Sequence, residues 1–134
     1  MVYSRKYNYY KFPGGGIEQG ESLHQALLRE VAEESGLQVL ESTVREYGLV
    51  HRVQKSDTKG IFIQDNYYFL CEAQQQVLSQ KLDDYEAEEG FTLEYVDPFY
   101  AIEVNRFADH GPKDQIMLER EARVLEFLIA EGHL

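Results

Sequence analysis

A glycine-rich loop followed by a helix with clustered acids constrains this chain more than any other feature. Pro13-Gly14-Gly15-Gly16 ends any regular element, because proline lacks a backbone N–H and glycine adopts backbone angles barred to other residues. Ser22 and Gln25 have the spacing of a capping box, which predicts that a helix begins there and runs to about Ser35. Gly36 stands where a left-handed helix end is expected.

The acids of this helix stand where apolar side chains are expected. On a wheel of about 100° per residue, Leu23 and Val31 bound an apolar stripe about 80° wide. Glu30 and Glu34 lie within about 20° of Leu23, so they continue the line of the stripe. Glu33 lies beside them. Two acids therefore occupy the face that packing would ordinarily fill.

Helix stability alone does not account for these acids. Glu30 is three and four residues from Glu33 and Glu34, and like charges at these spacings cost roughly 0.2–0.5 kcal/mol per pair. The helix macrodipole also disfavours negative charge near the C-terminal end. One interpretation is a solvated acidic face. The alternative, favoured by the alignment with the apolar stripe, is a site for Mg²⁺ or Mn²⁺, which prefer hard oxygen ligands.

Length and charge limit the class of protein. The chain has 134 residues, which predicts a single domain over 1–134. Its net charge of −11 argues against binding a nucleic-acid duplex or a membrane through a basic surface. No apolar run approaches a membrane span and no signal peptide is evident, so we expect a cytoplasmic protein. A single cysteine excludes an internal disulfide.

The rest of the chain alternates strand and helix patterns with short connections. This order predicts an α/β sandwich in which helices cover a mixed sheet. The expected strands are Tyr3–Phe12, Thr43–Arg52, Ile61–Ala73 and Gly90–Val96, with a turn over Gln54–Gly60, and the expected helices are Asp97–Asn105 and Asp114–Ala130.

The loop and helix together resemble the Nudix box. Gly15 is followed after five residues by Glu21 and after seven more by Arg29-Glu30-Val31-Ala32-Glu33-Glu34-Ser35-Gly36-Leu37. All nine specified positions are occupied, and a chance match in a chain of this length has a probability on the order of 10⁻⁷ to 10⁻⁸. The chain is therefore identified as resembling a family of Mg²⁺- or Mn²⁺-dependent hydrolases of nucleoside diphosphate derivatives, whose fold is an α/β/α sandwich.

The resemblance implies a role for each box residue. Glu30, Glu33 and Glu34 are expected to hold the metal, and Glu33 and Glu34 to take part in catalysis. Arg29 is expected to orient these carboxylates through an ion pair. The loop is expected to be supported by Glu21, Gly15 and Gly16.

An acidic segment after the box resembles the part of the family fold that often supplies a further glutamate. Among its acids, Glu89 is favoured as an extra ligand or base, followed by Glu86 and Glu88. A solvated acidic turn explains these residues nearly as well.

The segment before the box is short for this family. Only Met1 to Phe12 precede the glycine loop, so the N-terminal strand is expected to be short or missing. An unpaired sheet edge invites pairing with a second copy, which predicts a homodimer.

Two functions follow from the resemblance. The first is a metal-dependent hydrolase that cleaves the pyrophosphate linkage of a nucleotide sugar, a dinucleotide or a nucleoside triphosphate. The second is a catalytically weak nucleotide-binding or regulatory module with the same fold. The three clustered carboxylates favour the hydrolase, because a binding module has little need of them.

Overall fold

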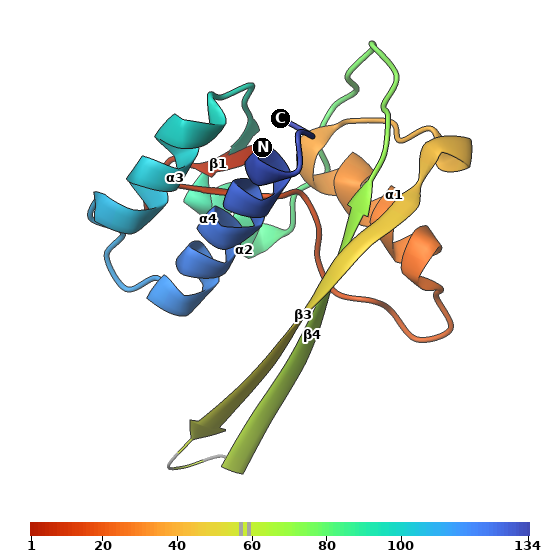
Figure 1. The fold of residues 1–134 in the computed structure, drawn as a ribbon. Coiled ribbons are helices and arrows are strands. Elements are labelled where there is room, and N and C mark those ends of the chain that lie inside the picture. Colours follow the sequence, from red (N-terminus) through yellow and green to blue (C-terminus); the bar gives the residue numbers. More distant parts are fainter. Residues whose placement is uncertain (57, 59) are drawn as a thin grey trace.

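The structure, a computed structural model, describes residues 1–56, 58 and 60–134. Strands and helices alternate along the chain, as Figure 1 shows. The elements are β1 (Val2–Ser4), β2 (Tyr9–Lys11), α1 (Leu23–Ser35), η1 (Glu41–Thr43), β3 (Arg45–Ser56), β4 (Gly60–Leu70), α2 (Asp84–Glu89), β5 (Phe91–Leu93), α3 (Pro98–Phe107) and α4 (Gln115–Ala130). Among the described residues, no helix is long and apolar enough to cross a membrane.

The helix expected from Ser22 to Ser35 is confirmed as α1. The Ser22 side chain accepts a hydrogen bond from the backbone N–H of Gln25, and the Gln25 side chain accepts one from the backbone N–H of Ser22. Gly36 ends the helix at φ 79°. A Cβ on Gly36 would lie 2.0 Å from the carbonyl oxygen of Leu78, so both the backbone angle and the close contact require glycine.

The expected single strand over Tyr3–Phe12 is wrong. The segment forms two short strands, β1 and β2, which pair antiparallel with Tyr3 opposite Tyr10. Asn8 has a positive φ of 53° in the turn between them, and asparagine tolerates that conformation. A strand at the N-terminus is therefore present, and it is three residues long.

The other elements appear with shifted bounds, and one helix was not expected. β3 and β4 extend into the predicted turn over Gln54–Gly60, of which residues 57 and 59 lie outside the described part of the chain. α2 falls in the segment read as an acidic turn. Its sequence signals are a capping box from Asp83 to Glu86 and a left-handed Gly90 at its end.

The α/β class is confirmed, but the strands form two antiparallel sheets instead of one mixed sheet. One sheet has the order β2-β1-β5, and the other is the β3–β4 ribbon. The base of the ribbon lies between two helices (Figure 1). His24 of α1 contacts Phe69 with ring centroids 5.5 Å apart, whereas Asp114, which caps α4, pairs with Arg52 at 2.8 Å.

The core fixes the position of β2, which leads directly into the glycine loop. Tyr9 packs with Phe91 and Leu118 in one buried cluster. The side-chain amide of Asn105 in α3 accepts from the backbone N–H of Tyr10 and donates to its carbonyl oxygen, both at 2.8 Å. This buried amide covers the edge of β2 as a neighbouring strand would.

Candidate functional site

The glycine loop lies against the first acid of the predicted set. A Cβ built on Gly15 would stand 2.4 Å from a carboxylate oxygen of Glu30. No larger residue fits there unless one of the two groups moves. The same construction on Gly16 meets no atom within 4 Å. Gly15 therefore lets the loop lie close against the middle of α1, because a larger residue would push the Glu30 side chain aside.

Arg29 holds the loop and two of the acids together. Its guanidinium donates to both carboxylate oxygens of Glu21, at 2.7 and 2.8 Å, and to the carbonyl oxygen of Gly16 at 3.0 Å. The same group donates to Glu30 at 2.8 Å and to Glu33 at 3.2 Å. These bonds from Arg29 lower the pKa of Glu21 to about 2. The orienting role of Arg29 stays a prediction, and these bonds are the contacts that such a role requires.

Glu34 is the most buried acid of the helix. Lys11 donates to its two carboxylate oxygens at 2.7 and 2.8 Å, and the backbone N–H of Gly14 donates to one of them at 3.2 Å. Burial raises the pKa of Glu34 to about 8, although the Lys11 ammonium opposes that shift. The neighbouring Glu86 carboxyl raises the pKa of Glu34 further. Glu34 is thus joined to the loop, β2 and α2 at once.

The acids on α1 differ in exposure as well as in partners. The Glu34 side chain is 1 % exposed, that of Glu30 is 17 % exposed and that of Glu33 is 40 % exposed. The alignment of Glu30 and Glu34 with the apolar stripe predicted this burial. Glu33 lies at the border of the site, where water and a substrate can reach its carboxylate.

The structure separates the three acids of the segment 85–90. Glu89 is buried and its carboxylate accepts from Ser4 at 3.0 Å, Tyr9 at 2.9 Å and Lys113 at 2.8 Å. Glu88 is exposed and pairs with Lys6. These partners tie Glu89 to β1, β2 and the segment before α4.

Glu86 is the member of this segment that meets the acids of α1. Its side chain is buried, caps its own helix through the N–H of Asp83 and lies close enough to Glu34 to raise the pKa of that carboxyl. Lys11 was not expected at the site. Its only sequence signal is a rare cation directly before the loop in a chain with an acidic excess.

The donor set fits a hard divalent cation by its chemistry, since carboxylates are the ligands that Mg²⁺ and Mn²⁺ prefer. Within the described residues, no three Asp, Glu, His or Cys side chains converge in a spacing suited to a metal ion. The cationic groups of Arg29 and Lys11 take the space between the carboxylates instead. The acids are thus already held around positive charge, which is the environment that a bound cation supplies.

Comparison with known proteins is consistent with this geometry. A family model described as NUDIX domain matches residues 2–110. The chain is 38% identical over 84 residues to the RNA pyrophosphohydrolase of Edwardsiella ictaluri, covering 55% of this chain and 48% of that protein. It is 36% identical over 86 residues to that of Shewanella loihica, covering 57% and 49%, and 35% identical over 82 residues to that of Baumannia cicadellinicola, covering 54% and 52%. The chain therefore spans about half the length of the curated relatives it matches.

Proposed function

The chain belongs to the Nudix family, and from that premise we propose that it is a divalent-metal-dependent pyrophosphohydrolase of a nucleoside diphosphate derivative. One observation carries the proposal: Arg29 binds Glu21, Glu30 and Glu33 together, so the box forms one connected loop-and-helix unit. The names of the relatives support cleavage of a phosphoric anhydride bond. They also add the triphosphate end of RNA to the candidate substrates.

The acids of α1 are the proposed metal ligands. Glu30, Glu33 and Glu34 would hold Mg²⁺ or Mn²⁺, which when bound neutralises phosphate charge and lowers the pKa of a coordinated water. Arg29 keeps Glu30 and Glu33 in fixed orientations before substrate arrives. This preorganisation matters, because phosphoryl transfer depends mainly on positioning and charge stabilisation.

The three acids of α1 differ in solvent exposure, and this difference suggests a different role for each. Glu33 has the most accessible carboxylate of the three and its bond to Arg29 is the longest in this set, at 3.2 Å. It is the proposed acceptor of the proton from the attacking water. Glu34, held by Lys11 and Gly14, keeps the buried end of the site in place.

Glu86 is the proposed fourth acid, in place of the Glu89 that the sequence favoured. Glu86 lies close enough to Glu34 to raise its pKa, whereas both carboxylate oxygens of Glu89 accept from neighbours outside the box. The donors to Glu89 come from β1, β2 and the segment before α4, and none of them is a residue of the box. Glu89 is proposed to support the site structurally.

The test is a substrate panel with separation of the products. The purified chain is incubated with millimolar Mg²⁺ or Mn²⁺ and with nucleotide sugars, dinucleotides, nucleoside triphosphates and a 5′-triphosphorylated RNA oligonucleotide. Metal-dependent cleavage of one class supports the proposal and identifies the substrate. Thermal stabilisation by a nucleotide without any phosphate product would favour the binding or regulatory module instead.

A further inference from the structure

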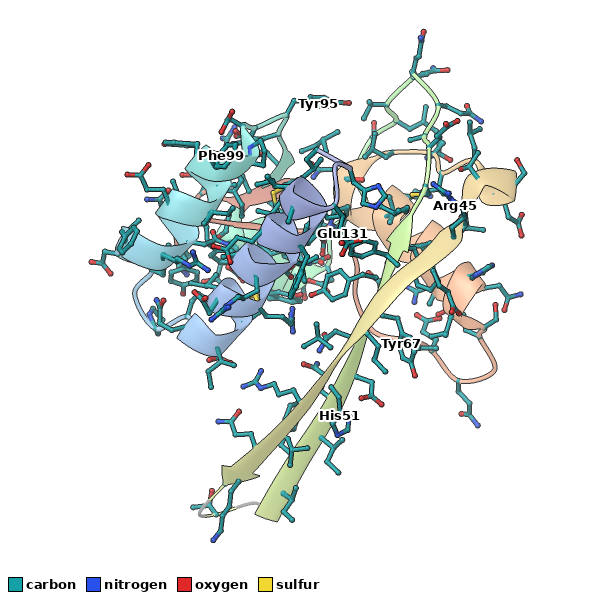
Figure 2. The ribbon with its side chains drawn as sticks, viewed as in Figure 1. Arg45, His51, Tyr67, Tyr95, Phe99 and Glu131 are labelled. Atoms are coloured by element: carbon teal, nitrogen blue, oxygen red, sulfur yellow. The ribbon has the colours of Figure 1, made fainter. Side chains whose placement is uncertain are left out.

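The β3–β4 ribbon carries an apolar face that nothing in the described chain covers. The far end of the ribbon extends away from the helices. Figure 2 labels His51 and Tyr67 along the ribbon, with Tyr67 nearer the body. Opposite residues in an antiparallel pair point to the same face, and the register places Leu49 opposite Tyr67 and Val53 opposite Ile63. We call this surface the ribbon face. Its apolar members are Leu49, Val53, Ile61, Ile63 and Tyr67, and the same register also places His51, Lys55 and Asp65 on it.

Every apolar member of the ribbon face is well exposed. The exposed fractions are Leu49 52%, Val53 59%, Ile61 70%, Ile63 62% and Tyr67 44%. Together they present on the order of 400 Å², comparable to the largest apolar patches of monomeric proteins, which are about 300–600 Å². Exposed apolar patches of this size are often interaction surfaces.

The opposite face of the same ribbon has a different composition. Arg52 faces Gln64 there, and its guanidinium reaches Asp114 at the start of α4 at 2.8 Å. The central carbon of that guanidinium lies over the Phe62 ring, 5.6 Å from the ring centroid. This polar face is turned to the side of α4. The ribbon is therefore amphipathic well beyond the part that packs on the body, which indicates a partner for the apolar side.

Charge confines any contact between two copies of this chain to the ribbon. Residues 45–56 and 60–70 contain three cations and two acids, a net charge of 3 − 2 = +1. The rest of the chain carries −11 − 1 = −12. Two such molecules repel one another through almost any contact except one made by the ribbon. A basic partner would instead be drawn to the acidic remainder.

The ribbon face is also suited to pack against itself. Its central polar pair, His51 and Asp65, is joined at 2.5 Å, so the two groups that a second copy would cover already pair with each other. Apolar pairs flank it on both sides, with Leu49 and Tyr67 toward the body and Val53 and Ile63 toward the tip. Sheets pack face to face at about 10 Å with interdigitated side chains, which these residues can supply.

We propose that this chain forms a homodimer in which the ribbon faces of two copies pack against each other about a two-fold axis. Two faces and their polar borders would bury on the order of 1,000 Å², the lower limit for a specific interface. Buried area does not fix affinity, so the dissociation constant has to be measured. The same residue of each copy then lies near the axis, so one substitution acts twice.

The test compares two neighbouring substitutions that add the same charge to opposite faces of β4. Ile63→Glu places a carboxylate on the ribbon face, and Gln64→Glu places one on the polar face. Sedimentation equilibrium of the full chain is measured from about 1 to about 100 µM. The proposal predicts a dimer for the wild type and Gln64→Glu, and a rise of at least 100-fold in the dissociation constant for Ile63→Glu.

Both side chains are exposed, so neither substitution opens a cavity in the core and the unfolding temperature of each variant checks that the fold is intact. A wild-type monomer at the highest concentration overturns the proposal. An Ile63→Glu protein that stays dimeric, or a Gln64→Glu protein that dissociates equally, also overturns it, because the contact then lies elsewhere or depends only on net charge.

Discussion

The Lys11 ammonium lies 2.7 and 2.8 Å from the two carboxylate oxygens of Glu34, and it also donates to the carbonyl oxygen of Gly14 at 3.0 Å. This pair joins the last residue of β2 to the last turn of α1 across the glycine loop. It holds the buried end of the acidic helix against the strand that precedes it. The position of the proposed metal ligands thus depends on a cation outside the helix.

Glu34→Gln is expected to lower kcat by roughly 100-fold or more with the metal unchanged, the scale for loss of a catalytic group. The amide keeps the size of the side chain but replaces one of the two oxygens that accept from Lys11 with an NH2 donor. Glu41→Gln, on the exposed η1 turn, is the matched control and should retain wild-type turnover. Near wild-type kcat for Glu34→Gln would show that this glutamate has been assigned wrongly.

Gly15→Ala and Gly16→Ala should have different effects although they differ by one position. The new Cβ at residue 15 meets the Glu30 carboxylate at 2.4 Å, whereas at residue 16 it meets open space. We expect Gly15→Ala to reduce kcat/KM by at least 10-fold, because displacing a group in the site by about 1 Å lowers the reaction rate strongly. Gly16→Ala should stay within about 2-fold, and equal losses in both variants would argue against the contact.

Arg29→Lys tests whether the forked guanidinium is needed in addition to its charge. Lysine cannot reproduce the paired bonds to Glu21 together with those to Glu30 and Glu33. We expect kcat/KM to fall by about 10- to 100-fold and the affinity for Mn²⁺, followed by electron paramagnetic resonance, to weaken as well. Arg123→Lys on the exposed side of α4 is the control. An unchanged Mn²⁺ affinity in Arg29→Lys would show that Arg29 does not orient the carboxylates.

Glu86→Gln and Glu89→Gln should separate catalysis from stability. Glu89 accepts from Ser4, Tyr9 and Lys113, so its amide variant leaves buried donors without a charged partner. We expect that variant to lower the unfolding temperature by several degrees, with turnover per folded molecule nearly retained. Glu86→Gln should instead lower kcat by about 10-fold or more. The reverse result would restore Glu89 as the fourth acid.

The acid dependence of stability can be tested at Arg106, which joins α3 to α4. It donates to Glu119 at 2.8 Å and to Glu126 at 2.6 Å, and these bonds lower the pKa of both carboxyls. A carboxyl whose pKa is lower in the folded state stabilises the protein at pH values above its unfolded pKa, near 4.3. This stabilisation is lost as the pH falls from there through the folded-state pKa. Arg106→Met should cost at most about 1 kcal/mol at pH 7, because the partners are partly exposed.

The gap in unfolding temperature between wild type and Arg106→Met is therefore expected to be a few degrees at neutral pH and to close as the solution is acidified past the unfolded pKa. Scanning calorimetry across this range measures it. Arg123→Met is the control, since Arg123 is more exposed and pairs with Glu119 at 3.1 Å. A gap that widens in acid would contradict the assigned sign.

Sequence reasoning was most successful where the determining interactions are local. The capping box of Ser22 and Gln25 and the left-handed Gly36 act within one helical turn, so α1 could be placed to the residue. It failed for Tyr3–Phe12, where the apolar and aromatic pattern suits one strand as well as two. The turn is closed by the backbone N–H of Asn8, which donates to the carbonyl oxygen of Ser4 at 2.8 Å, and β1 also pairs with β5, which is distant in sequence.

By itself, the sequence determined the acidic helix, the loop before it and the residues Arg29 can reach, because these contacts lie within one short segment. Only the tertiary structure decided that Lys11 pairs with Glu34 and that Glu86 lies near Glu34. It also decided that Glu89 instead accepts from Lys113, outside the box. Those contacts join residues 23 or more positions apart. No periodicity or capping rule reaches so far, since such distances are set by how sheets and helices pack around a shared core.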